Sequence, residues 1–164
     1  MNNIYHLAKH ILSFDEGFSQ KPYQDTKGNW TIGIGHLVGK KLQELCLTKN
    51  CVDQMFRDDY EIHAIGAENT IGKEVFERLS DARKVALISM CWTLGERGLR
   101  EFENMIEAIK KEDWDKAASE AMKSKWASDV DPRNRPNIGR DDRIAYMLRE
   151  GVFPEEYKVK NVFL

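Results

Sequence analysis

Cysteine and net charge are both scarce in this sequence of 164 residues. Its three cysteines, Cys46, Cys51 and Cys91, form no close CxxC pair, which argues against a disulfide framework and a zinc site. We therefore expect free thiols in a chain made in a reducing cytoplasm, with no metal. The net charge of −2 gives no general attraction to nucleic acid or to an anionic membrane, so we expect no nucleic-acid partner.

Long apolar runs are also missing from the N-terminal stretch MNNIYHLAKHILSFDEG. We therefore expect neither a signal peptide nor insertion into a membrane. Hydrophobic residues make up 41% of the chain and charged residues 32%, which is enough apolar material for the core of one domain. Nothing in the sequence demands more than a monomer. Basic residues gather only locally, near the C-terminus, at Arg133, Arg135, Arg140 and Arg143.

Apolar residues recur at helical spacing from Ile4 to Leu12 and predict a short first helix that ends at Gly17. The segment 21–38 is rich in glycine and predicts turns and a β-hairpin. Thr48 can cap a long helix. The apolar stripe expected on that helix consists of Val52, Met55, Phe56, Ile62 and Ile65.

The rest of the chain predicts a helical bundle. Ser80 and Asp113 can cap helices, Val85–Leu94 reads as a buried central helix, and Gly95 and Gly98 break it. A polar loop is expected over 128–139, followed by a last helix over 140–150. The fold class is therefore α+β, mostly α. We expect a small hairpin lobe with the connecting helix (about 13–65) and a helical lobe (1–12 and 66–164) within one domain.

Two carboxylates near the front of the chain are candidates for glycosidic chemistry, which needs a protonated acid and usually a second carboxylate. Glu16 lies where the first helix ends, beside the negative end of the helix dipole, which disfavours its ionised form. Asp25 lies in the turn QDTKGN, and Thr31 follows on the next strand. A helix end and a chain that doubles back can bring these groups to one groove. Their spacing alone leaves inverting and retaining geometries open.

The stretch FDEGFSQKPYQDTKGNWTIGIGH resembles the signature of the phage-type (T4-like) lysozymes, glycoside hydrolase family 24. The resemblance continues in MCWTLGERG, KSKWASD and IGRDDRIAYMLREG and so covers essentially the whole chain. It implies a two-lobed, lysozyme-like muramidase that cuts the β-1,4 bond between N-acetylmuramic acid and N-acetylglucosamine in peptidoglycan without a cofactor. The resemblance also implies that Glu16 is the general acid, that Asp25 and Thr31 position a water for inversion, and that Arg140 lies near Glu16.

Several other residues have chemistry that suits a structural or binding role. His36 is expected to be a structural histidine paired with a carboxylate such as Asp59. Glu96, after Gly95, is a candidate substrate-binding residue facing the space between the lobes, or else a capping residue. Trp92 and Trp126 fall at helical spacings where core packing is the usual role.

Two alternatives stay open at this point: a lytic transglycosylase, which needs no attacking water, and a catalytically silent peptidoglycan-binding module. Asp25 and Thr31 argue against the transglycosylase, and the presence of Glu16, Asp25 and Thr31 together argues against the silent module. The expected setting is that of an endolysin, held in the host bacterial cytoplasm until lysis and then acting on the cell wall in the periplasm. In that setting it would depend on a holin to reach the glycan strands.

Overall fold

The computed structural model describes residues 3–25, 27–39, 47–130 and 139–157. Contacts divide the chain into two compact units, the first reaching to Ile62 and the second beginning at His63. The lobe boundaries expected from the sequence stay a prediction. Cys46, Arg133 and Arg135 lie outside the described residues.

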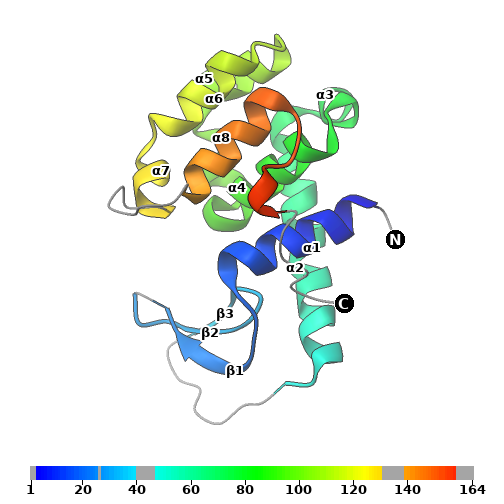
Figure 1. The fold of residues 1–164 in the computed structure, drawn as a ribbon, viewed down its shortest axis with the longest axis vertical. Coiled ribbons are helices and arrows are strands. Elements are labelled where there is room, and N and C mark those ends of the chain that lie inside the picture. The colour runs from blue at the N-terminus through cyan, green and yellow to red at the C-terminus, as the bar shows by residue number, and fades with distance from the viewer. Residues whose placement is uncertain (1–2, 26, 40–46, 131–138, 158–164) are drawn as a thin grey trace. The chain divides into compact units, whose positions relative to one another are not determined.

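The elements follow one another along the chain in the order shown by Figure 1. They are α1 (Asn3–Glu16), β1 (Ser19–Gln24), β2 (Trp30–Gly33), β3 (His36–Gly39), α2 (Lys49–Ile71), α3 (Lys73–Arg78), α4 (Asp81–Arg100), α5 (Glu103–Lys110), α6 (Trp114–Met122), α7 (Lys125–Val130), α8 (Arg140–Glu150) and a short 3₁₀ turn, η1 (Glu155–Tyr157). The predicted α+β, mostly helical class is confirmed.

Helix α1 ends at a glycine cap, as predicted. Gly17 has a φ of 78°, and its N–H donates to the carbonyl oxygen of Ser13 at 3.0 Å. Glycine adopts this left-handed conformation without the steric cost that a side chain brings. The cap turns the chain directly into β1, so Glu16 stands at the junction of helix and sheet.

The sheet of the first unit has three antiparallel strands in the order β1-β2-β3. The predicted hairpin is thus present, with a third strand beside it. Tyr23 pairs with Thr31 across β1 and β2, while Thr31 pairs with Leu37 across β2 and β3. Residues directly opposite in such a ladder point to the same face of the sheet. This register therefore sets which side chains accompany Thr31.

The first part of α2 holds both α1 and the sheet. Lys9 Nζ on α1 lies 2.6 Å from Asp53 Oδ1, and the ring of Tyr5 packs edge-to-face against Phe56 at 5.6 Å between centroids. From the sheet, His36 Nδ1 lies 2.7 Å from Asp59 Oδ2. The predicted pairing of His36 with Asp59 is confirmed. These contacts fix the first half of α1 and strand β3 against one helix.

The apolar stripe expected on α2 is only partly correct. Val52 and Phe56 are buried, but Ile62 is 65% exposed and Ile65 is 59% exposed. Six residues beyond Phe56, a helix has turned about 240° away, so Ile62 points elsewhere. The buried face continues instead at helical spacing through Ala67 and ends at Ile71.

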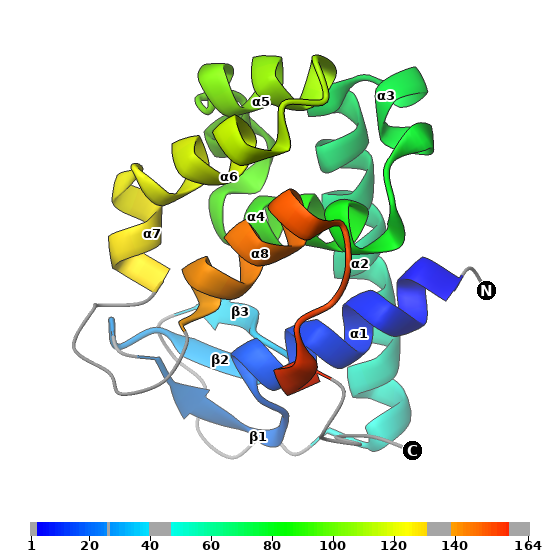
Figure 2. The same cartoon turned by 45° about the horizontal axis from the view of Figure 1, so that its top comes forward.

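In the second unit, α4 is the buried helix, as predicted. The side chains from Val85 to Cys91 are almost entirely inaccessible, and Ser80 Oγ caps the helix by accepting from the N–H of Arg83. Gly95 has non-helical angles (φ 68°, ψ 169°) and kinks the element. Helix α8 packs against α4 and α6, and α5 packs against α6. Figure 2 shows α8 lying across this unit.

Two helices were not expected from the sequence. Gly72, with a φ of 95°, ends α2, and α3 starts immediately and buries Phe76. Helix α7 covers the beginning of the predicted polar loop, so that expectation was wrong over 128–130. The physical reason is local: Ser124 Oγ accepts from the N–H of Ala127, and Trp126 is buried with its Nε1–H donating to Thr93 Oγ1 at 2.8 Å.

The described cysteines, Cys51 and Cys91, are free thiols, as expected. Burial, followed by the charge of Glu96, raises the pKa of Cys91 to about 11.

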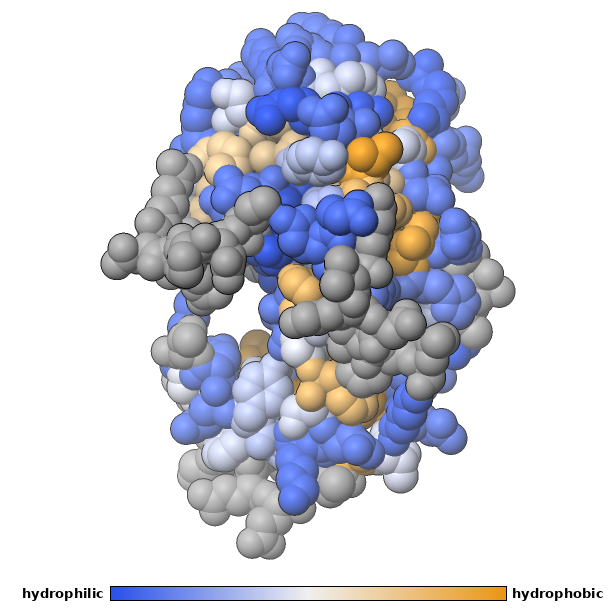
Figure 3. All heavy atoms as spheres, in the orientation of Figure 1, coloured by the Kyte–Doolittle hydropathy of each residue, from blue (hydrophilic) through white to orange (hydrophobic). Residues whose placement is uncertain are grey.

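Within the described ranges, no helix combines the length and the apolar character needed to cross a membrane. Figure 3 shows one face of the molecule, on which hydrophilic side chains predominate and hydrophobic ones form small groups.

Candidate functional site

Glu16 is half-buried at the last position of α1 and lies against the turn between β2 and β3. A Cβ atom placed on Gly35 would lie 3.1 Å from Glu16 Cγ and 3.2 Å from Glu16 Oε2. Gly35 also has a φ of 70°, a conformation that glycine tolerates best. The absence of a side chain at this position therefore leaves room for the Glu16 carboxyl group.

Asp25 follows β1 and is held by the turn that leads into β2. Its Oδ1 accepts the main-chain N–H groups of Lys27 and Asn29, both at 2.8 Å, and its Oδ2 accepts the side-chain amide of Asn29 at 3.1 Å. The hydrogen bonds from Asn29, helped by Lys27, hold the pKa of Asp25 below its ordinary value. The carboxylate is thus fixed in direction and ionised at neutral pH.

Thr31 lies on the central strand β2, with 7% of its surface exposed. Its cross-strand partner on β1 is Tyr23, and the alternation of a strand places Trp30 on the opposite face. Asp25 lies two residues beyond Tyr23, just after β1 ends, in the turn that leads to β2. Thr31 and Tyr23 therefore share one side of the β1–β2 pair.

Tyr23 lies near both Glu16 and Asp25. Its hydroxyl donates to the main-chain oxygen of Glu16 at 3.4 Å. Burial raises the pKa of Tyr23, and the negative charges of Glu16 and Asp25 raise it further. The phenol therefore lies within the electrostatic reach of both groups, and its residue pairs with Thr31 across β1 and β2.

This arrangement suits acid–base chemistry. A half-buried carboxyl group at a helix end can serve as a proton donor, while a carboxylate kept ionised by N–H donors can orient a water or stabilise positive charge. Sequence reasoning missed Tyr23, Asn29 and Gly35. The sequence signal for Tyr23 was its position in a strand, two residues before Asp25. The signal for Asn29 was its position in a tight turn, four residues after Asp25.

The other two predicted site residues belong to the second unit. Glu96 Oε1 lies 2.6 Å from Arg100 Nη2, and this bond, followed by one from Asn69, lowers the pKa of Glu96. Arg140 begins α8, is 9% exposed and donates from Nη2 to Ser89 Oγ at 3.1 Å. Both side chains thus have structural contacts within their own unit, and their roles toward substrate stay predictions.

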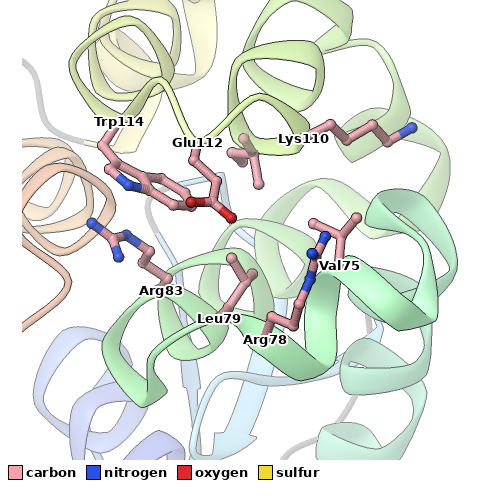
Figure 4. A pocket seen from close by; sticks show the side chains of 8 residues that line it. Val75, Arg78, Leu79, Arg83, Lys110, Glu112 and Trp114 are labelled. Atoms are coloured by element: carbon pink, nitrogen blue, oxygen red, sulfur yellow. The ribbon is translucent and has the colours of Figure 1, made fainter.

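A pocket of about 180 Å³ lies in the second unit between α3, α4, α5 and α6 (Figure 4). Arg83, which lines it, stacks over the ring of Trp114 at 3.7 Å and donates to the main-chain oxygens of Leu148 and Arg149. The guanidinium of Arg83 therefore binds the C-terminal end of α8. None of the predicted site residues lines this pocket.

Over the described residues, no group of His, Cys, Asp and Glu side chains has the arrangement of a metal site.

Gly35→Ala is expected to lower activity about tenfold, because the added methyl group would displace the Glu16 side chain from its place. The positive φ adds a stability cost of about 1 kcal/mol. Both effects can be checked by steady-state kinetics together with thermal unfolding. The matched control is Gly72→Ala, which also has a positive φ, of 95°, and open space around the added Cβ, but is not part of the turn that holds Asp25. An equal loss of activity in both variants would contradict the role given to the Gly35–Glu16 contact.

Comparison with known proteins finds similarity to phage-type lysozymes. Residues 14–135 match the family model described as phage lysozyme. A probable T4-type lysozyme 2 of Dictyostelium discoideum is 26% identical over 92% of this chain and 97% of its own length. A second protein of that organism, probable T4-type lysozyme 1, is also 26% identical, over 87% of this chain and 94% of its own length. The pre-baseplate central spike protein Gp5 of Enterobacteria phage T4 is 26% identical over 86% of this chain, which spans 27% of that protein.

Proposed function

Because the chain belongs to the phage lysozyme family, whose members are glycoside hydrolases, we propose that it hydrolyses the β-1,4 bond between N-acetylmuramic acid and N-acetylglucosamine in peptidoglycan. Glu16 protonates the oxygen of the leaving sugar. Asp25 and Thr31 hold the water that attacks the opposite face of the sugar ring, so the reaction proceeds in one displacement with inversion. No cofactor takes part.

The observation that carries this proposal is that the Tyr23 hydroxyl donates to the main-chain oxygen of Glu16, while the charges of Glu16 and Asp25 both raise the pKa of Tyr23. The two carboxyl groups differ in their surroundings, as an acid and its partner must. Asp25 accepts three N–H donors and is kept ionised. Glu16 is half-buried against the Gly35 turn. The hydroxyl of Thr31, on the same side of the β1–β2 pair as Tyr23, can both donate to and accept from a water.

The wild-type protein is expected to reduce the turbidity of permeabilised Gram-negative cells and to release new reducing ends from purified peptidoglycan. Hydrolysis by water generates a free reducing sugar, whereas a lytic transglycosylase generates a 1,6-anhydro end. Mass spectrometry of the released glycan fragments separates the two products, since they differ by one water. Fragments that carry 1,6-anhydro ends would show that the protein is a lytic transglycosylase and not a hydrolase. Binding without cleavage would indicate a silent peptidoglycan-binding module.

We also propose an endolysin setting: a monomer held in the host bacterial cytoplasm until a holin opens the way to the wall. The support is the likeness to phage lysozymes. Relatives from Dictyostelium and a phage spike protein belong to other settings, so the biological role needs its own test. Expression with a holin should lyse intact bacteria, and expression alone should not. Lysis by this protein alone would contradict the dependence on a holin.

A further inference from the structure

The turn between β1 and β2 holds Asp25 by more contacts than the turn itself requires. The main chain already closes it: the N–H of Asp25 donates to the oxygen of Asn29 at 2.9 Å, and the N–H of Gly28 donates to the oxygen of Asp25 at 3.0 Å. The N–H of Lys27 adds the bond to Asp25 Oδ1 that is common in Asx turns. The side-chain amide of Asn29 adds nothing to this closure and is directed at the carboxylate alone.

The donors are shared unequally between the two carboxylate oxygens. Oδ1 accepts the N–H groups of Lys27 and Asn29, which use both of its lone pairs. Oδ2 accepts the Asn29 amide at 3.1 Å and keeps one acceptor position. The amide therefore fixes the rotation of the carboxylate about its last bond and leaves a single direction in which Oδ2 can accept a further donor.

We propose that Asn29 is a positioning residue for the reaction: its main-chain N–H and its side-chain amide hold the two oxygens of Asp25 so that Oδ2 receives the attacking water. This inference rests on the proposed function, because it assigns the atom of Asp25 that the hydrolysis uses. Asn29 itself does not touch the substrate in this account. It acts through the direction and the charge of Asp25.

Removing the amide in Asn29→Ala should raise the pKa of Asp25, because a donor to the ionised form is lost. The main-chain N–H of residue 29 and that of Lys27 remain, so the turn should persist. In Asn29→Asp, a second carboxylate would face Oδ2, and the pKa of Asp25 should rise further. The other titratable and charged groups around Asp25, namely Lys27 in the turn and Tyr23 and Glu16 beside it, are unchanged in both variants.

The test combines two measurements on the whole protein. The side-chain carboxyl carbon of Asp25 is titrated by carbon-13 NMR, and kcat and KM on soluble peptidoglycan fragments are measured against pH. For Asn29→Ala we expect a higher pKa of Asp25, an acid limb of kcat/KM moved to higher pH, and kcat lowered about tenfold with KM little changed. A merely structural role would change thermal stability and leave the titration of Asp25 where it was.

Gln24→Ala is the matched control. Gln24 also carries an amide in this turn, but its Nε2 lies 3.5 Å from the main-chain oxygen of Gly28 and not on Asp25. The inference is overturned if Asn29→Ala leaves the Asp25 titration unchanged, if the pKa rises without a fall in kcat, or if Gln24→Ala has the same effects. An inactive wild type would overturn the proposed function, and the NMR titration would still decide whether the Asn29 amide holds Asp25.

Discussion

Glu16→Gln is expected to lower the rate of wall hydrolysis by about 10²–10⁴-fold, the range typical for loss of a general acid. Glutamine keeps the size of the side chain and its packing against the Gly35 turn, but it cannot give a proton to the leaving oxygen. The measurement is the initial rate of turbidity loss of permeabilised Gram-negative cells, with thermal unfolding to establish that the variant is folded.

Glu61→Gln makes the same chemical change at an exposed position on α2 and serves as the control for the loss of one negative charge. It should clear cells at the wild-type rate. Equal clearing by wild type and Glu16→Gln would end the assignment of Glu16 as the acid. Equal slowing by both variants would indicate that overall charge, and not proton donation, limits the assay.

Asp25→Asn should produce the second large loss, of about 10²-fold or more in kcat. The side-chain oxygen of asparagine can still accept the main-chain N–H groups of Lys27 and Asn29, so the turn should form. What disappears is the negative charge that accepts the attacking water in the proposed mechanism. Steady-state kinetics on soluble peptidoglycan fragments measures this loss.

The same variant carries its own internal check. The charge of Asp25 is one cause of the raised pKa of Tyr23, so spectrophotometric titration of the phenols should show that pKa moving down in Asp25→Asn. Unchanged kcat in a folded variant that shows this shift would remove Asp25 from the mechanism. In the wild type, the lowered pKa of Asp25 keeps the carboxylate ionised into acid solution, so activity that depends on it is lost only as the pH falls through that lowered pKa.

Much of the fold could be predicted because it depends on local chemistry. Capping side chains at Ser80 and Asp113 accept N–H groups where expected, and glycines at positions 17 and 151 take the left-handed conformation that ends α1 and α8. The pairing of His36 with Asp59 was also predicted, since a histidine after the strand and a carboxylate on the long helix complement one another. The caps need only a few neighbouring residues, whereas the pair of His36 and Asp59 joins residues that are 23 apart in the sequence.

What could not be predicted depends on packing between distant segments. The exposure of Ile62 and Ile65 follows from which face of α2 the rest of the protein covers, and hydrophobicity alone does not decide that. At the site, the sequence identified Glu16, Asp25 and Thr31 as candidates by type and spacing. The contacts of Tyr23 and Asn29 with them depend on strand register and on the exact path of one turn, which the composition of a turn leaves open.

The most direct test of a single displacement by a water held at Asp25 and Thr31 is the configuration of the first product. Cleavage of purified glycan strands can be followed by proton NMR, which distinguishes the anomers of the new N-acetylmuramic acid end before they equilibrate. The account predicts that the α-anomer forms first from the β-linked substrate. A β-anomer formed first would show retention and contradict it.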